Sequence, residues 1–167
     1  HQLKKSPILE KIFCLPGNAG IQEIAECIKN INISDHLVIV NFCLQNQIDL
    51  VVIGSEQPLI EGLVDVLINH NIKAFGPSKN AARLEGSKAF TKEICDEFSI
   101  PTAKYQVFNN SLDAKNYLNE VNFPCVIKAD GIAAGKGVII AGNYEEALAA
   151  IQEIFGGKLE IPPVHHT

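Results

Sequence analysis

Two short apolar runs separated by a glycine-rich loop place the strongest constraint on how this chain can fold. The runs are 125–127 and 138–141, and both have the length and residue types of buried strands. The segment between them contains Lys128, Asp130, Gly131, Gly135, Lys136 and Gly137. Because a strand follows the loop as well as precedes it, we expect an antiparallel hairpin with the loop at its tip.

The residue types in this loop are those that bind phosphate groups. Glycines let backbone N–H groups approach phosphate oxygens, since no Cβ atom stands in the way. Lys128, at the end of the first strand, adds a compact positive charge. A flexible hairpin tip that happens to contain lysine has the same composition, so the loop by itself fits both interpretations about equally.

A Walker A loop is excluded by spacing, chemistry and context. That motif needs four residues between its first glycine and its Gly-Lys pair, then Ser or Thr, and it opens a helix. Only three residues lie between Gly131 and Gly135. Gly137 stands where the hydroxyl residue should be, and a strand follows.

Composition limits the classes of function. With 47% hydrophobic and 20% charged residues among 167, the chain can form a real core. No apolar run approaches the roughly 18 residues of a membrane span, and no leader pattern opens the chain. The net charge of −5 without a basic stripe argues against a nucleic-acid partner. We therefore expect a soluble cytoplasmic protein that binds neither membranes nor nucleic acid.

The cysteines and the absence of methionine carry two further expectations. The five cysteines occur singly among apolar neighbours, without a CxxC pair, which predicts buried, reduced thiols in preference to zinc ligands or disulfides. The sequence has no Met, which predicts that it begins inside a gene product or after processing.

The first half alternates apolar runs with helical patterns, as α/β domains do. We expect strands at 11–15, 48–54 and 73–75. We expect the tail of a helix at 1–6, ended by Pro7, and helices that begin at Ile21 and at Pro58. We also expect a helix over 35–45 with Ser34 as its cap. A further helix is expected over 79–99, with Ser78 as its cap and a break at Gly86. The run 37–40 also fits a strand, so its assignment stays open.

The second half has the order strand, helix, strand, loop, strand, helix, which predicts an α+β subdomain. A strand is expected at 105–108, and a helix with Ser111 as its cap is expected to run to about Val121. Asn143 and Glu146 have the spacing of a capping box for a helix through Phe155. We predict an N-terminal domain at 1–78, a connecting helical segment at 79–100 and the subdomain at 101–167.

Three features are candidate binding residues with plain structural alternatives. The turns 17–20 and 54–58 follow strands, and in open α/β sheets such ends line one crevice. For the first, the residues by themselves favour an ordinary turn before a helix. Glu56 is either an acceptor for a substrate hydroxyl or a solvated carboxylate at a helix start. Lys88, after the break at Gly86, is either a second cation for phosphate or a solvated lysine.

Together these segments resemble one family, phosphoribosylamine-glycine ligase (glycinamide ribonucleotide synthetase) of the ATP-grasp superfamily. The matching motifs are Pro16-Gly17-Asn18-Ala19-Gly20, Gly54-Ser55-Glu56-Gln57-Pro58-Leu59, Phe75-Gly76-Pro77-Ser78-Lys79, Leu84-Glu85-Gly86-Ser87-Lys88-Ala89-Phe90, Ile100-Pro101-Thr102 and Val126-Ile127-Lys128-Ala129-Asp130-Gly131. The resemblance implies a Rossmann-like parallel-sheet domain without its first strand, followed by the start of an ATP-grasp subdomain.

The resemblance also implies an activity. Such enzymes join glycine to 5-phosphoribosylamine with ATP, through a glycyl phosphate, in purine biosynthesis. By similarity the catalytic cations are Lys88 and Lys128. By similarity ATP is bound by these lysines with Asp130, Gly131, Gly135, Lys136 and Gly137, and the phosphoribosylamine by Gly17, Asn18, Ala19, Gly20, Gly54, Glu56 and Pro58. Mg²⁺ is implied too, with ligands in a C-terminal part that this sequence lacks.

Departures from the family leave alternatives open. The family's first strand and the rest of its ATP-grasp domain are missing, so we expect that this chain by itself does not catalyse the reaction. We also expect a monomer. His165 and His166, near the end of the chain, are expected to be disordered rather than metal ligands. The alternatives are another ATP-grasp ligase or carboxylase, a non-catalytic nucleotide-binding module, and an incomplete product that folds poorly.

Overall fold

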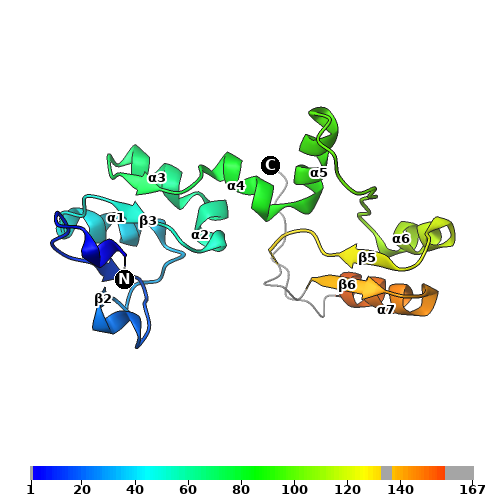
Figure 1. Ribbon diagram of the computed structural model, residues 1–167, viewed down its shortest axis with the longest axis horizontal. Helices are drawn as coiled ribbons and strands as arrows, with labels where there is room; N and C mark the ends of the chain where they lie inside the picture. Colours follow the sequence, from blue (N-terminus) through cyan, green and yellow to red (C-terminus); the bar gives the residue numbers. More distant parts are fainter. Residues whose placement is uncertain (1, 133–136, 157–167) are drawn as a thin grey trace. The chain divides into compact units, whose positions relative to one another are not determined.

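The computed structural model describes residues 2–132 and 137–156. The chain divides into two units, residues 1–79 and 80–167. In Figure 1 the first unit runs from blue to green and the second from green to orange. Each unit is described by itself below.

The first unit is a mixed α/β structure with two small parallel sheets. Strand β1 pairs with β2, and β3 pairs with β4, both in parallel. Its elements in order are η1 (Leu3–Lys5), β1 (Phe13–Cys14), η2 (Ile21–Glu23), β2 (Glu26–Cys27), α1 (His36–Gln45), β3 (Val51–Val52), α2 (Glu56–Glu61), α3 (Leu63–Asn69) and β4 (Ala74–Phe75). The expected α/β class and its parallel pairing are therefore confirmed at this level.

The core of the first unit lies between α1, α3 and the strands. Leu67 of α3 has no exposed surface, and Val40 of α1 is 2% exposed. The other buried members are Ile39, Cys43, Leu63 and Ile72. Burial raises the pKa of the Cys43 thiol above its ordinary value, because the charged thiolate is disfavoured away from water.

Helix α1 confirms the helical interpretation of 35–45 over the strand alternative, but its cap differs from the prediction. Asp35, not Ser34, is the N-cap, and its Oδ1 accepts a hydrogen bond from Val38 N at 3.2 Å. Both residue types can cap a helix. The local pattern therefore located the helix start to within one residue.

The helix expected from Pro58 is split into α2 and α3. The break is at Gly62, whose φ of 94° lies in the left-handed region that glycine adopts without strain. Gly62 N donates to Pro58 O at 3.2 Å and to Leu59 O at 3.1 Å, which ends α2. The apolar spacing continues across the break, so periodicity alone predicted one helix.

Near the N-terminus, two expectations were wrong in detail and one strand was missed. Helices were expected at 1–6 and from Ile21, and both are three-residue 3-10 turns, η1 and η2. The strand β2 was not expected at all. Its two residues lie in register with Phe13 and Cys14, so a partner strand rather than a local sequence signal defines it.

The second unit consists of helices and one antiparallel hairpin (Figure 1). Its elements are α4 (Lys79–Gly86, beginning at the division), α5 (Lys88–Glu97), α6 (Ser111–Tyr117), η3 (Leu118–Glu120), β5 (Cys125–Lys128), β6 (Val138–Ala141) and α7 (Tyr144–Phe155). The hairpin, the break after Gly86 and the last helix agree with the sequence prediction. The buried core is Ala114, Leu118, Ala141, Ala147 and Ile151.

The predicted strand at 105–108 is not formed, because no strand among the described residues pairs with it. Instead this segment is tied to α5 by side chains. Tyr105 OH donates to Asp96 Oδ2 at 2.6 Å, and Lys92 Nζ donates to Ala103 O at 2.9 Å. Residues 105–108 have side chains typical of a strand, but no strand of the described part of the chain lies beside them to form backbone hydrogen bonds.

The caps of the last two helices can be compared with the prediction directly. Asn110, not Ser111, is the N-cap of α6, and its Oδ1 accepts from Asp113 N at 2.9 Å. Asn143 caps α7 as predicted, accepting from Glu146 N at 2.9 Å. The Glu146 carboxylate reaches back to Gly142 N at 2.7 Å, so the reciprocal bond is made one residue earlier than in the usual capping box.

Candidate functional site

The β5–β6 hairpin has one face in the core and one face outward. Cys125 and Ile127 pack against the core formed with α6 and α7. The alternate residue Val126 is 53% exposed, and its register partner Ile140 is 72% exposed. Since successive side chains of a strand point to opposite faces, Lys128 lies on the outward face with Val126. An apolar surface with a lysine at one end is thus left uncovered within this unit.

The hairpin continues past its last strand pair toward the glycine-rich segment. Ala129 N donates to Gly137 O at 2.8 Å, which extends the pairing by one bond. Gly131 and Gly137 are both buried. Of the residues predicted to bind ATP, Gly135 and Lys136 lie outside the described residues.

Asp130 connects this end of the hairpin to the start of α5. Its Oδ1 accepts hydrogen bonds from Lys88 N at 2.6 Å and Ala89 N at 3.3 Å. Its Oδ2 accepts from the Ser87 hydroxyl at 2.9 Å. A carboxylate in this place also interacts favourably with the positive end of the helix dipole.

The side chain of Lys88 makes the return contact. Its Nζ donates to Gly131 O at 2.8 Å, so the amine lies at the base of the glycine-rich segment. Lys128 lies three positions before Gly131 in the chain and on the outward face. Among the described residues, neither lysine forms an ion pair with a carboxylate. The structure therefore brings the two predicted cations to one end of the hairpin.

Sequence analysis missed Ser87 at this site. Ser87 caps α5, because its Oγ accepts from Phe90 N at 3.1 Å while its hydroxyl donates to Asp130. A serine directly after the predicted break at Gly86 is an N-cap signal, so the sequence did contain a clue. Nothing local indicated that the contacting carboxylate comes from Asp130.

The first segment predicted to bind substrate, 17–20, is a turn closed by Asn18. The Asn18 Oδ1 accepts from Ile21 N at 3.0 Å, and its carbonyl accepts from Gln22 N at 3.0 Å. Gly17 has a φ of 73°, and only Leu15 and Pro16 separate the turn from the end of β1. Asn18, Ala19 and Gly20 are exposed, and Gly17 is half-buried.

The second predicted substrate segment is Gly54 to Pro58, between β3 and the first turn of α2. Gly54 and Glu56 are exposed, whereas Pro58 is buried. Leu15 and Ile53, which lie just before the two predicted turns, pack against the same core. A crevice shared by the two turns stays a prediction.

An open groove of about 480 Å³ in this unit lies elsewhere and is lined by Ile28, Asn30, Ile31, Val38, Asn41, Phe42 and Gln45.

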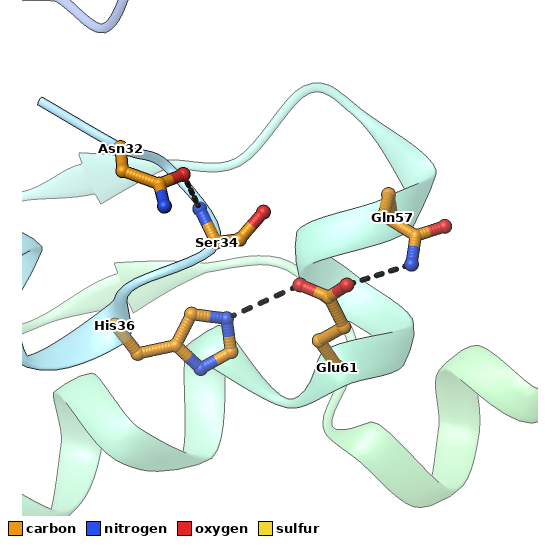
Figure 2. A network of polar contacts seen from close by, with 5 residues as sticks. All are labelled: Asn32, Ser34, His36, Gln57 and Glu61. Atoms are coloured by element: carbon orange, nitrogen blue, oxygen red, sulfur yellow. Dashed lines mark hydrogen bonds and ion pairs between the residues drawn. The ribbon is translucent and has the colours of Figure 1, made fainter. Parts of the chain in front are cut away.

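Polar side chains of α2 lie close to the start of α1 (Figure 2). His36 Nε2 lies 3.6 Å from Glu61 Oε2, and Gln57 Nε2 donates to Glu61 Oε1 at 2.7 Å. Asn32 Oδ1 accepts from Ser34 N at 3.1 Å in the turn before α1. Sequence analysis did not single out His36 or Glu61, because their contact depends on how the two helices pack.

Other kinds of site were sought in the described part of the chain. No group of three or more His, Cys, Asp or Glu side chains there is placed to hold a metal ion. None of the described helices is both long and apolar enough to cross a membrane. His165 and His166 lie outside the described residues. All five cysteines are free thiols, but only Cys43 is buried. The other four are partly exposed, so the expectation of buried thiols was wrong for them.

Two family models match the chain and cover most of it. Residues 1–85 match the phosphoribosylglycinamide synthetase N domain. Residues 86–160 match the phosphoribosylglycinamide synthetase ATP-grasp (A) domain.

A curated relative and two solved structures extend the comparison. A phosphoribosylamine-glycine ligase from Mesorhizobium japonicum is 50% identical over 157 residues, which are 94% of this chain and 37% of that protein. The crystal structure of a phosphoribosylamine-glycine ligase from Thermotoga maritima matches with a TM-score of 0.71 and 27% identity, over 94% of this chain and 36% of that one. N5-carboxyaminoimidazole ribonucleotide synthetase from Thermus thermophilus, at 19% identity, shares the fold with a TM-score of 0.69, over 92% of this chain and 40% of that one.

Proposed function

Because this chain belongs to the phosphoribosylglycinamide synthetase family, we propose that it is part of a ligase that joins glycine to 5-phosphoribosylamine with ATP. Membership confirms the resemblance that the sequence motifs indicated. The chain spans about a third of the length of the curated relatives it matches. The activity therefore belongs to a larger protein, to which this chain contributes an N domain and the beginning of the ATP-grasp domain.

The single observation that carries the proposal is the convergence of Lys88 with the end of the hairpin. The Lys88 amine lies at Gly131 O, at the base of the segment predicted to bind phosphate. Lys128 lies on the outward face of the same hairpin, beside the exposed apolar surface of Val126 and Ile140. This arrangement fits a nucleotide whose base rests on the apolar face and whose phosphates meet the two amines.

The chemistry needs positive charge because a carboxylate must approach a triphosphate. The glycine carboxylate oxygen attacks the γ-phosphorus of ATP, which forms glycyl phosphate and releases ADP. The amine of 5-phosphoribosylamine then attacks the glycyl carbonyl carbon and releases inorganic phosphate. In this scheme Lys88 and Lys128 stabilise the charge on the phosphate oxygens during the first step.

Apart from Asp130, which is treated below, the remaining predicted residues keep their roles as parts of the proposal. Gly131 and Gly137, with Gly135 and Lys136, contribute the glycine-rich segment over the nucleotide. Asn18, the turn around it and Glu56 contact the phosphoribosylamine, in a first domain of Rossmann-like type. No group of three or more His, Cys, Asp or Glu side chains among the described residues is placed to hold a metal ion. We propose that Mg²⁺ takes part in the reaction and that its protein ligands lie in the rest of the ATP-grasp domain.

Location and assembly are proposed on narrower grounds. Free thiols at all five cysteines are usual in the reducing cytoplasm, where we place the protein. We propose that it acts as a monomer on small-molecule substrates.

Calorimetry with ATP on this chain tests the nucleotide site. We expect ATP to bind, and we expect Lys88→Ala and Lys128→Ala each to weaken binding by about tenfold or more, since each removes a charge-assisted contact to phosphate. Lys104→Ala is the matched control, because Lys104 is an exposed lysine of the same unit outside the predicted site. Folded chain that releases no heat with ATP contradicts the site.

Substrate dependence tests the reaction. The complete protein should release phosphate from ATP only when glycine and 5-phosphoribosylamine are both present. Phosphate release that depends on bicarbonate instead of glycine would indicate the alternative function, a carboxylase. ATP binding without turnover in the complete protein would indicate a nucleotide-binding module.

A further inference from the structure

We propose that Asp130 is a positioning residue that fixes the start of α5, and with it the amine of Lys88, to the base of the glycine-rich segment. This inference rests on the proposed function, because it gives a reason for the placement of Lys88 at the nucleotide site. It also reassigns Asp130 from a direct contact with ATP to a group that acts through Lys88.

The contacts of Asp130 account for both carboxylate oxygens. Oδ1 accepts from two backbone amides of α5, and Oδ2 accepts from the Ser87 hydroxyl. These donors are 41 to 43 positions away in the chain. Asp130 therefore links the β5–β6 hairpin to the start of α5, a strand pair and a helix that are far apart in the chain.

The backbone amides of Lys88 and Ala89 have no hydrogen-bond acceptor within their own helix. Lys88 is the first residue of α5 and Ala89 the second, and the first amides of a helix have no acceptor within it. The next amide, of Phe90, is already satisfied by Ser87 Oγ at 3.1 Å. Asp130 completes the cap, and its negative charge suits the positive end of the helix.

The two segments hold each other in both directions. Asp130 reaches from the hairpin to the backbone of Lys88 at 2.6 Å, and the Lys88 amine reaches back to Gly131 O at 2.8 Å. Without the carboxylate, α5 would keep only the flexible lysine side chain as its link to Gly131. The amine would then sample more positions and bind a phosphate less well, since its order would have to be established on binding.

Amide hydrogen exchange tests the clamp without any nucleotide. In Asp130→Ala we expect the amides of Lys88 and Ala89 to exchange at least about tenfold faster, because they lose the one acceptor that the described residues give them. The amide of Phe90 should change little, because Ser87 still caps it. Asp130→Asn keeps one acceptor oxygen and should give an intermediate result, which also covers the case in which the alanine variant folds poorly.

ATP affinity then tests the action through Lys88. Asp130→Ala should weaken ATP binding by about tenfold, yet have little further effect in a Lys88→Ala background, because the residue acts by placing that amine. Asp113→Ala is the matched control, since Asp113 is an exposed acid of the same unit whose side-chain contact is local. The chain with Asp113→Ala should bind ATP with the same affinity as the unchanged chain.

The outcomes separate the two proposals. An unchanged chain that binds no ATP overturns the nucleotide site, while the exchange rates still decide whether the clamp exists. Unchanged exchange at Lys88 and Ala89 in both Asp130 variants overturns the clamp. Losses of affinity that add fully in the double variant overturn the action through Lys88.

Discussion

The sulfur of Cys27 lies 2.3 Å from the point that a Cβ atom on Gly17 would occupy. The Cβ atom of Cys27 lies 3.0 Å from the same point, and that of Cys14 lies 3.4 Å away. Cys14 and Cys27 are register partners in the β1–β2 pair. The turn predicted to bind substrate thus folds back so closely over the strands that only glycine fits at its first position.

Replacing Gly17 with alanine should therefore disturb this turn. The new methyl group meets a sulfur atom, and the φ of 73° is unfavourable for any residue with a Cβ atom. We expect Gly17→Ala to lower the free energy of unfolding by about 1–3 kcal/mol. Urea denaturation followed by circular dichroism measures this change.

Two further variants isolate the cause. Gly54→Ala should change stability by no more than about 0.5 kcal/mol, because nothing lies within 4 Å of its added methyl group and the residue is exposed. Adding Cys27→Ala to Gly17→Ala removes the sulfur and should recover part of the loss. If Gly17→Ala and Gly54→Ala lower the free energy of unfolding equally, the close approach of Cys27 to Gly17 is contradicted.

Leu67 should be among the most sensitive apolar positions of the first unit. It has no exposed surface and belongs to the core between α1 and α3. Leu67→Ala leaves a cavity, and we expect it to cost about 2–5 kcal/mol of unfolding free energy. The neighbouring Ile68 is 56% exposed, so Ile68→Ala should cost well under half as much in the same denaturation experiment. Similar losses at both positions would show that the core lies elsewhere.

The sequence predicted those elements that have a local physical signal. The hairpin follows from two apolar runs with glycines between them, and the start of α7 follows from Asn143. Predictions failed where a distant partner decides the structure. Residues 105–108 have strand-like side chains but no strand beside them, and β2 exists only because β1 lies next to it.

The same distinction holds for the candidate site. Lys88 and Lys128 were identified from motifs, and the structure brings both to the same end of the hairpin. The link between Asp130 and the start of α5 spans more than forty positions, so no pattern within a short window could indicate it. The motifs proposed Lys88 and Lys128 as site residues, and that role stays a prediction; the contact between Asp130 and the start of α5 is a property of the fold.

The cap of α7 offers a test on a smaller energy scale. Asn143 Oδ1 accepts from Glu146 N at 2.9 Å, which satisfies an amide with no acceptor inside the helix. We expect Asn143→Ala to lower the free energy of unfolding by about 1 kcal/mol. Asn116→Ala serves as control, because Asn116 is an exposed residue inside α6, where alanine is at least as favourable. A loss at Asn116 as large as that at Asn143 would rule out the capping explanation.

Tyr105 should titrate at unusually high pH. Its hydrogen bond to Asp96, together with burial and nearby negative charge, raises the pKa of Tyr105 from 10.0 to about 12. In the chain, the absorbance change from ionising this phenol should therefore appear near pH 12. The difference between the chain and its Tyr105→Phe variant isolates this step among the three tyrosines.

The direction of the pH effect on stability follows from the same shift. The unfolded chain ionises Tyr105 near its ordinary pKa, while the folded chain keeps the phenol protonated to about 12. The stabilising contribution is thus complete below pH 10 and is lost as the pH rises from about 10 to about 12. Asp96→Asn removes the charged acceptor, so the pKa of Tyr105 should fall back toward 10. A difference titration centred near pH 10 in the unchanged, folded chain would contradict the contact between α5 and the segment at 105–108.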